Sequence, residues 1–492
     1  MENNQSRDFK IEKYEPSEIL KHFANISKIP RISGNHKQIS EYLYKFFENN
    51  ATSVKKDKAN NIIVFKKATK GYEDKPSICL QAHYDMIHDV QKQYKHNPDT
   101  DPIKPFVKDG WLQAEGTTLG ADNGIGVATI MAIFESNSII HGPIWALLTN
   151  DEERGFKGAL ALEENQVDAK YLINIDSDGL EKIVIGNGCA LAYRASTGVK
   201  HVDLSSSDLV YRFSLENLLG GHSGIEISKT RINAAVVISN FLKQISLEVP
   251  LNIVDIKIGN ANNTIPSNGY VEIAINKKNQ ENFEHKLETM LNGLKLAFDD
   301  YEQNFDVEFW DVTQKHTKKI SNEDTKRIIN AMLLLPNGMV YYDKHYDRSL
   351  LSNNIGLVYV KDGKFIVEWA TRALYEFNRD ALSFRSLTAI ELLGFETVEK
   401  LVELVNWHPV RGKLLNQFKT IIEIYLKRVV NEAVLVSQGL EVGPILRKNP
   451  SIVEAISIGP TIIEEHTHNE KMELESLKTL WKVIKELLIC ID

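Results

Sequence analysis

A histidine and an aspartate stand two residues apart at the end of an apolar run, in the segment Leu80-Gln-Ala-His83-Tyr-Asp85. Residues two apart in a strand share one face, so Asp85 can hold the second ring nitrogen of His83. A carboxylate in that place fixes the tautomer of a metal-bound histidine and raises its basicity. The pair therefore indicates a metal ligand with its orienting partner. The alternative is a solvated strand edge.

A glycine-rich segment at residues 116–126 carries Asp122 and runs into a helical pattern. It lacks the Gly-Lys-Ser/Thr ending of a phosphate loop and the Gly-x-Gly-x-x-Gly spacing of a dinucleotide site. Its glycines instead allow a closely packed backbone that turns the Asp122 side chain inward. The alternative is that Asp122 caps the helix that follows.

Further acids follow two other apolar runs. Asp151, Glu152 and Glu153 follow the run at 147–149 after one asparagine, and Asp176 follows the run at 173–175. Three adjacent carboxylates repel one another unless a cation compensates their charge. A metal site is therefore one interpretation of the acidic run, and a solvated acidic turn is the other.

Two histidines, His466 and His468, follow another strand and turn near the C-terminus. If the strands form one sheet, the strand ends that carry His83, Glu153 and Asp176, with Asp122 at the entry of a helix, converge at one edge. Two imidazoles and three carboxylates suit a pair of zinc or similar ions about 3.5–4 Å apart, bridged by one carboxylate. The sequence therefore predicts a two-metal centre.

The elements that must position these residues alternate between strands and helices. Short apolar runs at 61–65, 78–84, 144–149, 172–175 and 183–185 are separated in several places by helical patterns, notably at 124–134. Such alternation predicts an α/β fold whose sites collect at the carboxyl ends of the strands.

From about residue 209 the pattern changes to strand, helix, two strands, helix and strand, ending near residue 310. This order is typical of a ferredoxin-like fold, and a looser second copy is expected at 325–404. We therefore expect a discontinuous catalytic domain at 1–190 and 405–492, interrupted at 191–404 by an inserted α+β lid or dimerisation domain.

The composition excludes several classes of protein. The formal net charge is −8 and is spread along the chain, which does not favour nucleic-acid or anionic-membrane binding. No apolar run reaches membrane-spanning length. Cys79, Cys189 and Cys490 lie far apart and lack the paired spacing of a disulfide framework or structural zinc site. We expect a cytoplasmic protein that acts on small molecules.

At these motifs the sequence resembles the two-zinc dipeptidases, aminopeptidases and carboxypeptidases that share a catalytic domain and a lid. It is most similar to their cytosolic aminoacyl-histidine (Xaa-His) dipeptidase branch. The likeness covers nearly the whole chain. The motifs that carry it, in order, are Gln-Ala-His83-Tyr-Asp85-Met, Gly120-Ala-Asp122-Asn-Gly, Thr149-Asn-Asp-Glu-Glu-Arg-Gly155, Ile175-Asp176-Ser, Gly220-Gly-His-Ser-Gly224, Asn263-Thr-Ile-Pro266 and Gly459-Pro-Thr.

The resemblance implies a ligand set for two divalent ions. His83, Asp122 and Asp176 would bind one ion, and Glu153, Asp122 and His466 would bind the other. Zinc is the expected metal, with cobalt or manganese as alternatives. In place of the Ser-Pro-Asp-Glu usual in this branch, the chain continues after His466 with Thr-His468-Asn-Glu, so His468 is a competing candidate for the same ligand role.

The resemblance also implies the catalytic and substrate-binding residues. Asp85 would orient His83, and Glu152 would take a proton from metal-activated water and deliver it to the leaving amine. In the inserted domain His222 would polarise the scissile carbonyl and Asn263 would contact the substrate. Arg385 would bind the substrate's terminal carboxylate, a role suited to a planar guanidinium.

The expected activity is therefore hydrolysis of dipeptides of the Xaa-His type. A broader dipeptidase, a tripeptide aminopeptidase or an N-acyl amino acid deacylase could use the same site, and a catalytically silent binding protein is the alternative from another class. Ser437-Gln-Gly-Leu-Glu441 stands where this branch usually has His-Ala-Gly-Leu-Glu, which bears on substrate preference. The expected partners are a small peptide substrate and a second copy bound through the lid.

Overall fold

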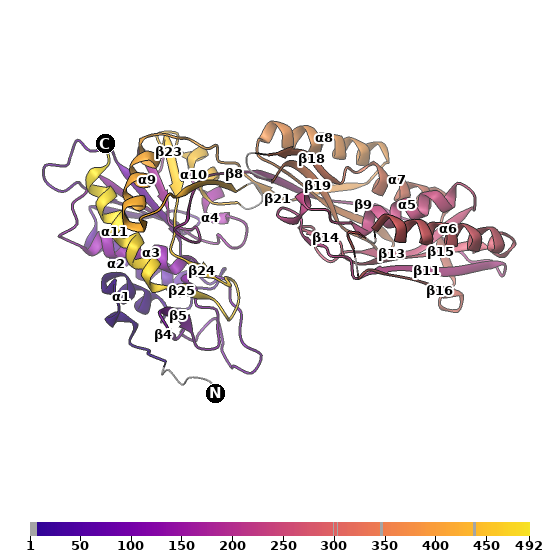
Figure 1. Cartoon of the computed structure of the whole chain (residues 1–492), viewed down its shortest axis with the longest axis horizontal. Helices are drawn as coiled ribbons and strands as arrows, with labels where there is room; N and C mark the ends of the chain where they lie inside the picture. Colours follow the sequence, from indigo (N-terminus) through magenta and orange to yellow (C-terminus); the bar gives the residue numbers. More distant parts are fainter. Residues whose placement is uncertain (1–6, 299, 303, 345–347, 436–438) are drawn as a thin grey trace. The chain divides into compact units, whose positions relative to one another are not determined.

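The computed structural model describes residues 7–298, 300–302, 304–344, 348–435 and 439–492. These residues form two compact units (Figure 1). The first unit combines the chain up to Asn187 with Trp407–Leu435 and Leu440–Asp492, and the second unit holds Gly188–Asn406. The limits of 191–404 for an inserted domain stay a prediction, because compactness alone does not show that a segment folds independently.

The sheet of the first unit has eight strands in the order β1-β2-β6-β3-β7-β23-β8-β22. Its central strand β3 (Ile78–His83) pairs in parallel with β6 (Ile144–Thr149) and with β7 (Tyr171–Asn174), so their carboxyl ends meet at one edge. All of β3 is buried, which explains why its residues up to His83 are apolar except for Gln81. The expected α/β fold is confirmed. The remaining strands are β1 (Ser53–Lys56), β2 (Ile62–Lys66), β8 (Lys182–Asn187), β22 (Asn431–Leu435) and β23 (Glu454–Ser457).

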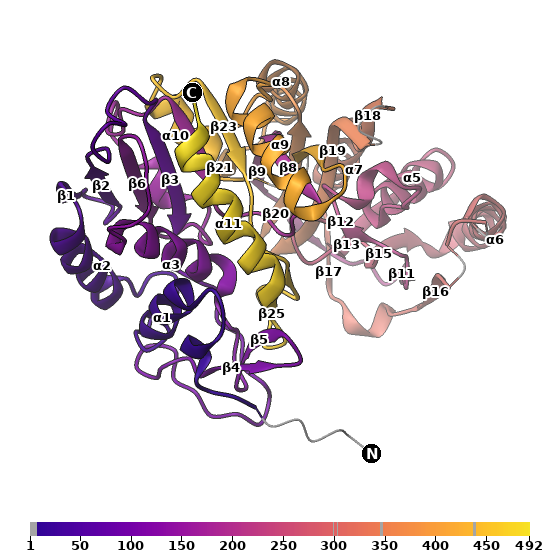
Figure 2. The same cartoon turned by 60° about the vertical axis from the view of Figure 1, so that its left-hand side comes forward.

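Helix α3 (Ala121–Glu135) packs directly on β3, and α1 (Ser17–Ile26) and α2 (Lys37–Asn50) contact α3. The small and apolar residues of α3 are buried on nearly every side of the helix, as expected of a helix that lacks a polar face. Helix α9 (Lys413–Leu426) packs on β23 and against α11 (Leu474–Cys490), which runs diagonally across Figure 2. The shorter helices are η1 (Ile11–Lys13), α4 (Lys157–Leu160) and α10 (Val442–Lys448).

A second, four-stranded sheet of the first unit has the order β24-β25-β5-β4. Its strands β24 (Ile462–Ile463) and β25 (Lys471–Glu473) flank the turn that carries His466, and β25 pairs with β5 (Trp111–Ala114). Strand β5 in turn pairs with β4 (Pro105–Lys108). This small sheet therefore fixes the ends of a segment that carries one of the predicted ligands.

The second unit contains a nine-stranded antiparallel sheet, in which eight strands run in the order β16-β11-β15-β13-β19-β20-β9-β21 and β18 pairs with β19. Its elements are β9 (Cys189–Gly198), β11 (Asp208–Glu216), α5 (Ala234–Ser246), β13 (Leu251–Ile258), β15 (Gly269–Asn276), α6 (Gln280–Phe298), β16 (Asp306–Asp311), α7 (Asn322–Leu334), β18 (Gly338–Asp343), β19 (Arg348–Lys361), β20 (Lys364–Ala373), α8 (Glu376–Leu392) and β21 (Thr397–Leu404).

Both halves of this sheet have the same β-α-β-β-α-β layout. One half is β11-α5-β13-β15-α6-β16 and the other is β9-α7-β19-β20-α8-β21. Their second strands, β13 and β19, meet in the middle, where Lys257 lies opposite Tyr359. The expected position of the second copy, 325–404, was wrong at its start, since its first strand is β9. The pattern is hidden in the sequence because the first copy is inserted after β9.

Helices α5, α6, α7 and α8 contribute to one hydrophobic core with this sheet, so they cover the same face of it. Within the core, the rings of Phe213 and Phe241 stack with centroids 4.1 Å apart, and Trp369 is fully buried. Among the described residues, no helix is both long enough and apolar enough to cross a membrane. The short elements of this unit are β10 (His201–Asp203), β12 (Gly221–His222), η2 (Glu226–Ser228), β14 (Thr264–Ile265), η3 (Lys277–Asn279), η4 (Thr313–Lys315) and β17 (Lys318–Ile320).

Candidate metal centre

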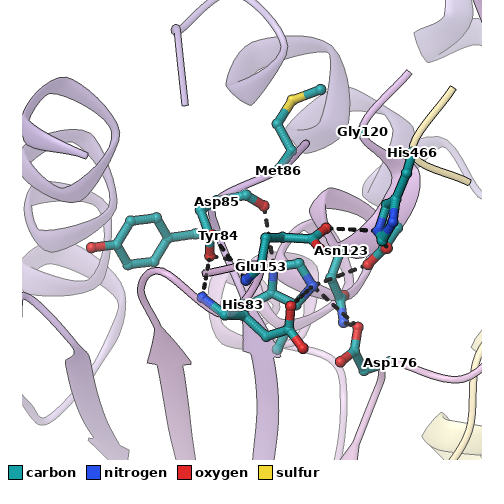
Figure 3. Close-up of polar contacts among 12 residues, drawn as sticks. His83, Tyr84, Asp85, Met86, Gly120, Asn123, Glu153, Asp176 and His466 are labelled. Atoms are coloured by element: carbon teal, nitrogen blue, oxygen red, sulfur yellow. Dashed lines mark hydrogen bonds and ion pairs between the residues drawn. The ribbon is translucent and has the colours of Figure 1, made fainter. Parts of the chain in front are cut away.

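Strand β3 ends at His83, and the following turn brings Asp85 beside its imidazole (Figure 3). Nδ1 of His83 lies 3.1 Å from the backbone oxygen of Asp85 and 3.5 Å from its carboxylate. The carboxylate also accepts hydrogen bonds from Ser33 Oγ at 2.7 Å and from the backbone N–H of Glu152 at 3.1 Å. Both His83 and Asp85 are buried, so the ring is held with Nε2 directed toward the remaining acids.

Asp122 lies between two imidazoles at the start of α3. One carboxylate oxygen is 3.0 Å from Nε2 of His83, and the other is 3.0 Å from Nε2 of His466. The preceding Gly120 has a φ of +68°, and a Cβ there would lie 2.5 Å from the guanidinium of Arg31. A side chain at position 120 is thus excluded both by backbone strain and by space, which explains the glycine before this ligand.

The adjacent acids after β6 point to different histidines. Glu153 Oε1 lies 3.0 Å from Nε2 of His466, whereas Glu152 Oε2 lies 3.9 Å from Nε2 of His83. The backbone N–H of Glu153 donates to Asp85 at 3.4 Å. Asp85 therefore positions the acidic run as well as the imidazole of β3.

Asp176 follows β7, and its Oδ1 lies 3.4 Å from Nε2 of His83. The same oxygen accepts a hydrogen bond from the side-chain amide of Asn123, the residue after the shared ligand Asp122. Three consecutive sheet strands, β6, β3 and β7, therefore deliver acids and an imidazole to one edge, as the parallel arrangement requires.

The structure distinguishes the two competing histidines of the C-terminal segment. His466 contacts the acids of the centre, whereas Nδ1 of His468 lies 2.6 Å from the carboxylate of Asp89. The backbone N–H of His468 donates to the same carboxylate at 2.9 Å. The geometry therefore places His466, and not His468, among the candidate ligands.

In the part of the chain that the structure describes, the candidate ligand atoms form three groups, each with all its atoms within 4.8 Å of one another. The groups are His83/Asp122/Asp176, Asp122/Glu153/His466 and His83/Glu152/Glu153. The first two groups share only Asp122, so together they offer three ligands to each of two ions with one bridging carboxylate. The third group would use Glu152 as a ligand instead of as a base.

The electrostatics of the centre favour bound cations. Hydrogen bonds to Asp122 and Glu153 raise the pKa of His466 to about 11. Although burial alone would lower it, the charges of Asp176 and Glu152 keep the pKa of His83 well above its usual value. Acids that attract a proton to a neighbouring imidazole attract a divalent cation in the same way. The residues present therefore fit a two-metal centre.

Glu152 lies in an environment that favours its protonated form. Burial, followed by the negative charges of Asp176 and Glu441, raises the pKa of Glu152 well above its usual value. Glu441 is itself fully buried, which raises its pKa to about 8, and it accepts a hydrogen bond from Gln81 at 2.8 Å. A carboxyl group with a raised pKa can carry a proton near neutral pH. Ser437, which departs from the family pattern four residues before Glu441, lies outside the described residues.

Two buried charges near the centre were missed by the sequence analysis. Arg31 and Glu470 are 3% and 2% exposed, and both bond to the backbone of Gly120. Arg31 lies in no recognisable motif, and each residue is far in sequence from the turn that it contacts. The only signal was that Glu470 closes the segment that begins at His466.

In the second unit, His222 and Asn263 lie beside each other. Strand β12 pairs with β14 so that His222 is opposite Thr264, and the N–H of Ser223 donates to the backbone oxygen of Asn263 at 2.8 Å. The Asn263 side chain is exposed. The structure thus brings together two residues that are 41 positions apart in the sequence.

Burial, followed by the charge of Arg372, lowers the pKa of His222, so this arginine lies within electrostatic range of the imidazole. Strand β20 carries Arg372 opposite Ser352, and Asn354 on the same face donates to the backbone oxygen of Thr264 at 2.7 Å. Arg385 instead lies on the exposed side of α8. Arg372 is therefore a second candidate for the carboxylate-binding role, which sequence reasoning missed because nothing local marks this arginine.

A mainly parallel sheet whose strand ends gather two overlapping histidine–carboxylate groups, with a further acid beside them, defines a metal-dependent hydrolase. The comparison with known families is more specific. The chain belongs to the peptidase family M20/M25/M40, which matches residues 79–489.

Two relatives are similar over almost the whole chain. The sequence is 29% identical over 471 residues to the cytosol non-specific dipeptidase of Escherichia coli (strain K12), covering 95% of this chain and 96% of the relative. The crystal structure of aminoacylhistidine dipeptidase from Vibrio alginolyticus matches with a TM-score of 0.89 and 28% identity, covering 100% of this chain and 99% of that one. A tripeptidase from Staphylococcus aureus subsp. aureus Mu50 has a TM-score of 0.52 and 16% identity over 96% and 98% of the two chains, which shows the fold alone.

Proposed function

We propose that this protein is a two-metal dipeptidase that hydrolyses the single peptide bond of its substrate. The observation that carries the proposal is that two groups of three ligands share only Asp122, with Glu152 beside them. Similarity to a non-specific dipeptidase and to an aminoacylhistidine dipeptidase supports the substrate class.

The proposed metal ligands are those that the sequence predicts. His83, Asp122 and Asp176 would hold one ion, and Glu153, Asp122 and His466 would hold the other. Zinc suits this mixture of imidazole and carboxylate, and cobalt or manganese could replace it. When bound, two such ions supply a Lewis acid and lower the pKa of a water molecule.

In the proposed reaction, Glu152 takes the proton from the attacking water and delivers it to the leaving amine. Its burial and acidic neighbours favour the step in which it holds that proton. Asp85 contributes by holding His83 through Nδ1 and by fixing the backbone N–H of Glu152. Asp85 is therefore proposed as a positioning residue.

The second unit is proposed to supply contacts to the substrate. His222 would polarise the scissile carbonyl and Asn263 would bind the substrate, a role that fits its exposed side chain. For the terminal carboxylate, Arg385 is the candidate from the sequence, and Arg372 is the candidate from its electrostatic effect on His222. An arginine that binds this carboxylate would restrict the enzyme to short peptides.

Xaa-His dipeptides are the proposed preferred substrates. The names of the two relatives support two versions of this proposal, a narrow one from the aminoacylhistidine dipeptidase and a broad one from the non-specific dipeptidase. A tripeptide aminopeptidase and an N-acyl amino acid deacylase are the competing activities for the same centre. A cytoplasmic location, supported by the name of the Escherichia coli relative, and a homodimer formed through the second unit are proposed as well.

The test is a substrate panel with zinc-loaded protein. It should contain Xaa-His dipeptides, dipeptides without histidine, tripeptides and N-acetyl amino acids, each assayed for kcat/KM. Hydrolysis confined to dipeptides supports the proposal, and a preference for histidine at the second position supports its narrow version. Faster cleavage of tripeptides or of the acylated amino acids would overturn it.

A further inference from the structure

The turn that presents Asp122 is bound by the carboxylate of Glu470. One oxygen of Glu470 accepts the backbone N–H of Gly120 at 2.7 Å, and the other accepts the N–H of Asp122 at 3.1 Å. The side chain is 2% exposed, so water does not compete for these contacts. Glu470 therefore holds the backbone from which the bridging carboxylate projects.

Arg31 binds the same turn through the backbone oxygen of Gly120. Its guanidinium donates to the backbone oxygen of Gly120, and also to those of Tyr84 at 3.2 Å and Asp85 at 3.3 Å. The last two residues directly follow His83. Glu470 therefore binds the backbone N–H of Gly120, and Arg31 binds its backbone oxygen. Arg31 also links Gly120 to the turn that follows β3.

Glu470 also belongs to the segment that carries His466, the imidazole on the other side of Asp122. The carboxylate oxygens of Asp122 are each 3.0 Å from one of the two imidazoles, so a shift of its backbone would disturb both contacts. Among the described residues, Glu470 is in none of the groups of ligand atoms. It can therefore influence bound ions without binding them, through the residues that it holds.

We propose that Glu470 is a positioning residue for both metal ions, acting through the backbone of Asp122. This inference depends on the two-metal function proposed above. Residues that orient metal ligands without touching the ion typically change metal affinity about 10–100-fold when they are replaced. Because Asp122 is shared, replacement of Glu470 should lower the metal affinity of both sites. Loss of a ligand that only one ion uses should mainly lower the affinity of that site.

The experiment titrates metal-free protein with Co²⁺ and follows its visible absorption together with the number of ions bound. In Glu470→Gln, the new NH₂ group must face one of the two backbone N–H groups that the carboxylate accepted. We expect two ions to bind, each about 10–100-fold more weakly than in the wild type. Glu153→Gln should instead lower the affinity for the ion that His466 binds and leave the affinity for the ion at His83 unchanged.

Glu464→Gln is the matched control, because Glu464 is an exposed acid in the same turn and should leave both affinities unchanged. Thermal unfolding of each metal-free variant separates folding from metal binding. A lower melting temperature of Glu470→Gln with unchanged Co²⁺ affinities would overturn the inference and make Glu470 a purely structural residue. If Glu470→Gln does not fold, Glu470→Asp, which keeps the charge but is one methylene shorter, takes its place with the same expected weakening. A wild type that binds fewer than two ions would overturn the proposed function itself.

Discussion

Neutralising Glu152 and neutralising Glu153, its neighbour, should affect metal binding differently. Glu152 Oε2 lies 3.9 Å from Nε2 of His83, beyond hydrogen-bond distance, so Glu152→Gln leaves the contacts of His83 with other acids in place. Glu153 Oε1 lies 3.0 Å from Nε2 of His466 and is one of three ligand atoms on that side. Glu152→Gln should therefore keep the metals, and Glu153→Gln should lose one.

The expected magnitudes differ in the same way. A positioned general base contributes about 10²–10⁴-fold to the rate, so Glu152→Gln should lower kcat by this factor, equivalent to about 3–5 kcal/mol of the barrier. Removing an orienting residue typically lowers metal affinity about 10–100-fold. Removing one of three ligands should lower the affinity for that ion at least as much. Glu153→Gln should then regain part of its activity at high metal concentration.

Two measurements check this pair of variants. Elemental analysis after exhaustive dialysis gives the metal content, and dipeptide hydrolysis at saturating zinc gives kcat. Glu152→Asp is a useful companion, because it retains a carboxylate but moves it away from the centre by one methylene. Loss of metal from Glu152→Gln, with metal retained in Glu153→Gln, would reverse the assignment and make Glu152 the ligand, as in the third group of ligand atoms.

Three further outcomes are expected. Arg372→Ala and Arg385→Ala should be compared on a dipeptide and on its C-terminal amide, since the variant that lacks the carboxylate-binding arginine loses kcat/KM on the free acid and little more on the amide. Equal cleavage of both substrates by the wild type would exclude a role for either arginine. At pH 7 the raised pKa values of His83 and His466, the latter about 11, mean that both rings hold protons without metal. Metal binding should therefore release protons and tighten as the pH rises, and calorimetry in buffers of different ionisation enthalpy measures the release; identical heats would contradict it. Phe241→Ala, which removes a ring stacked in the core of the second unit, should cost about 3–5 kcal/mol of unfolding free energy without changing the metal content.

The residues at strand ends could be located from the sequence because the strands of a parallel sheet end at the same edge. A buried parallel strand is a continuous apolar run, and its carboxyl end is where the run stops. His83, Glu153 and Asp176 each follow such a run, so their convergence followed from the order of elements alone. The choice between His466 and His468 did not, because residues two apart in a turn have no fixed relation to a sheet edge.

The contacts made to backbone atoms were not predictable from the sequence. Arg31 and Glu470 contact the peptide of Gly120, and any residue type at that position would offer the same N–H and oxygen. No spacing rule connects Glu470 with a turn 350 residues away. Arg372 was missed for a similar reason, since strand pairing and not local pattern brings it toward His222.

The most direct test of a two-metal dipeptidase is the rate of Xaa-His dipeptide hydrolysis as zinc is added stepwise to metal-free protein. Five imidazole and carboxylate ligands, one of which is the shared Asp122, predict no activity without metal and full activity once about two equivalents are bound. Full activity in protein proved free of metal would contradict the two-metal centre, and a fully zinc-loaded protein that cleaves no dipeptide would contradict the proposed reaction.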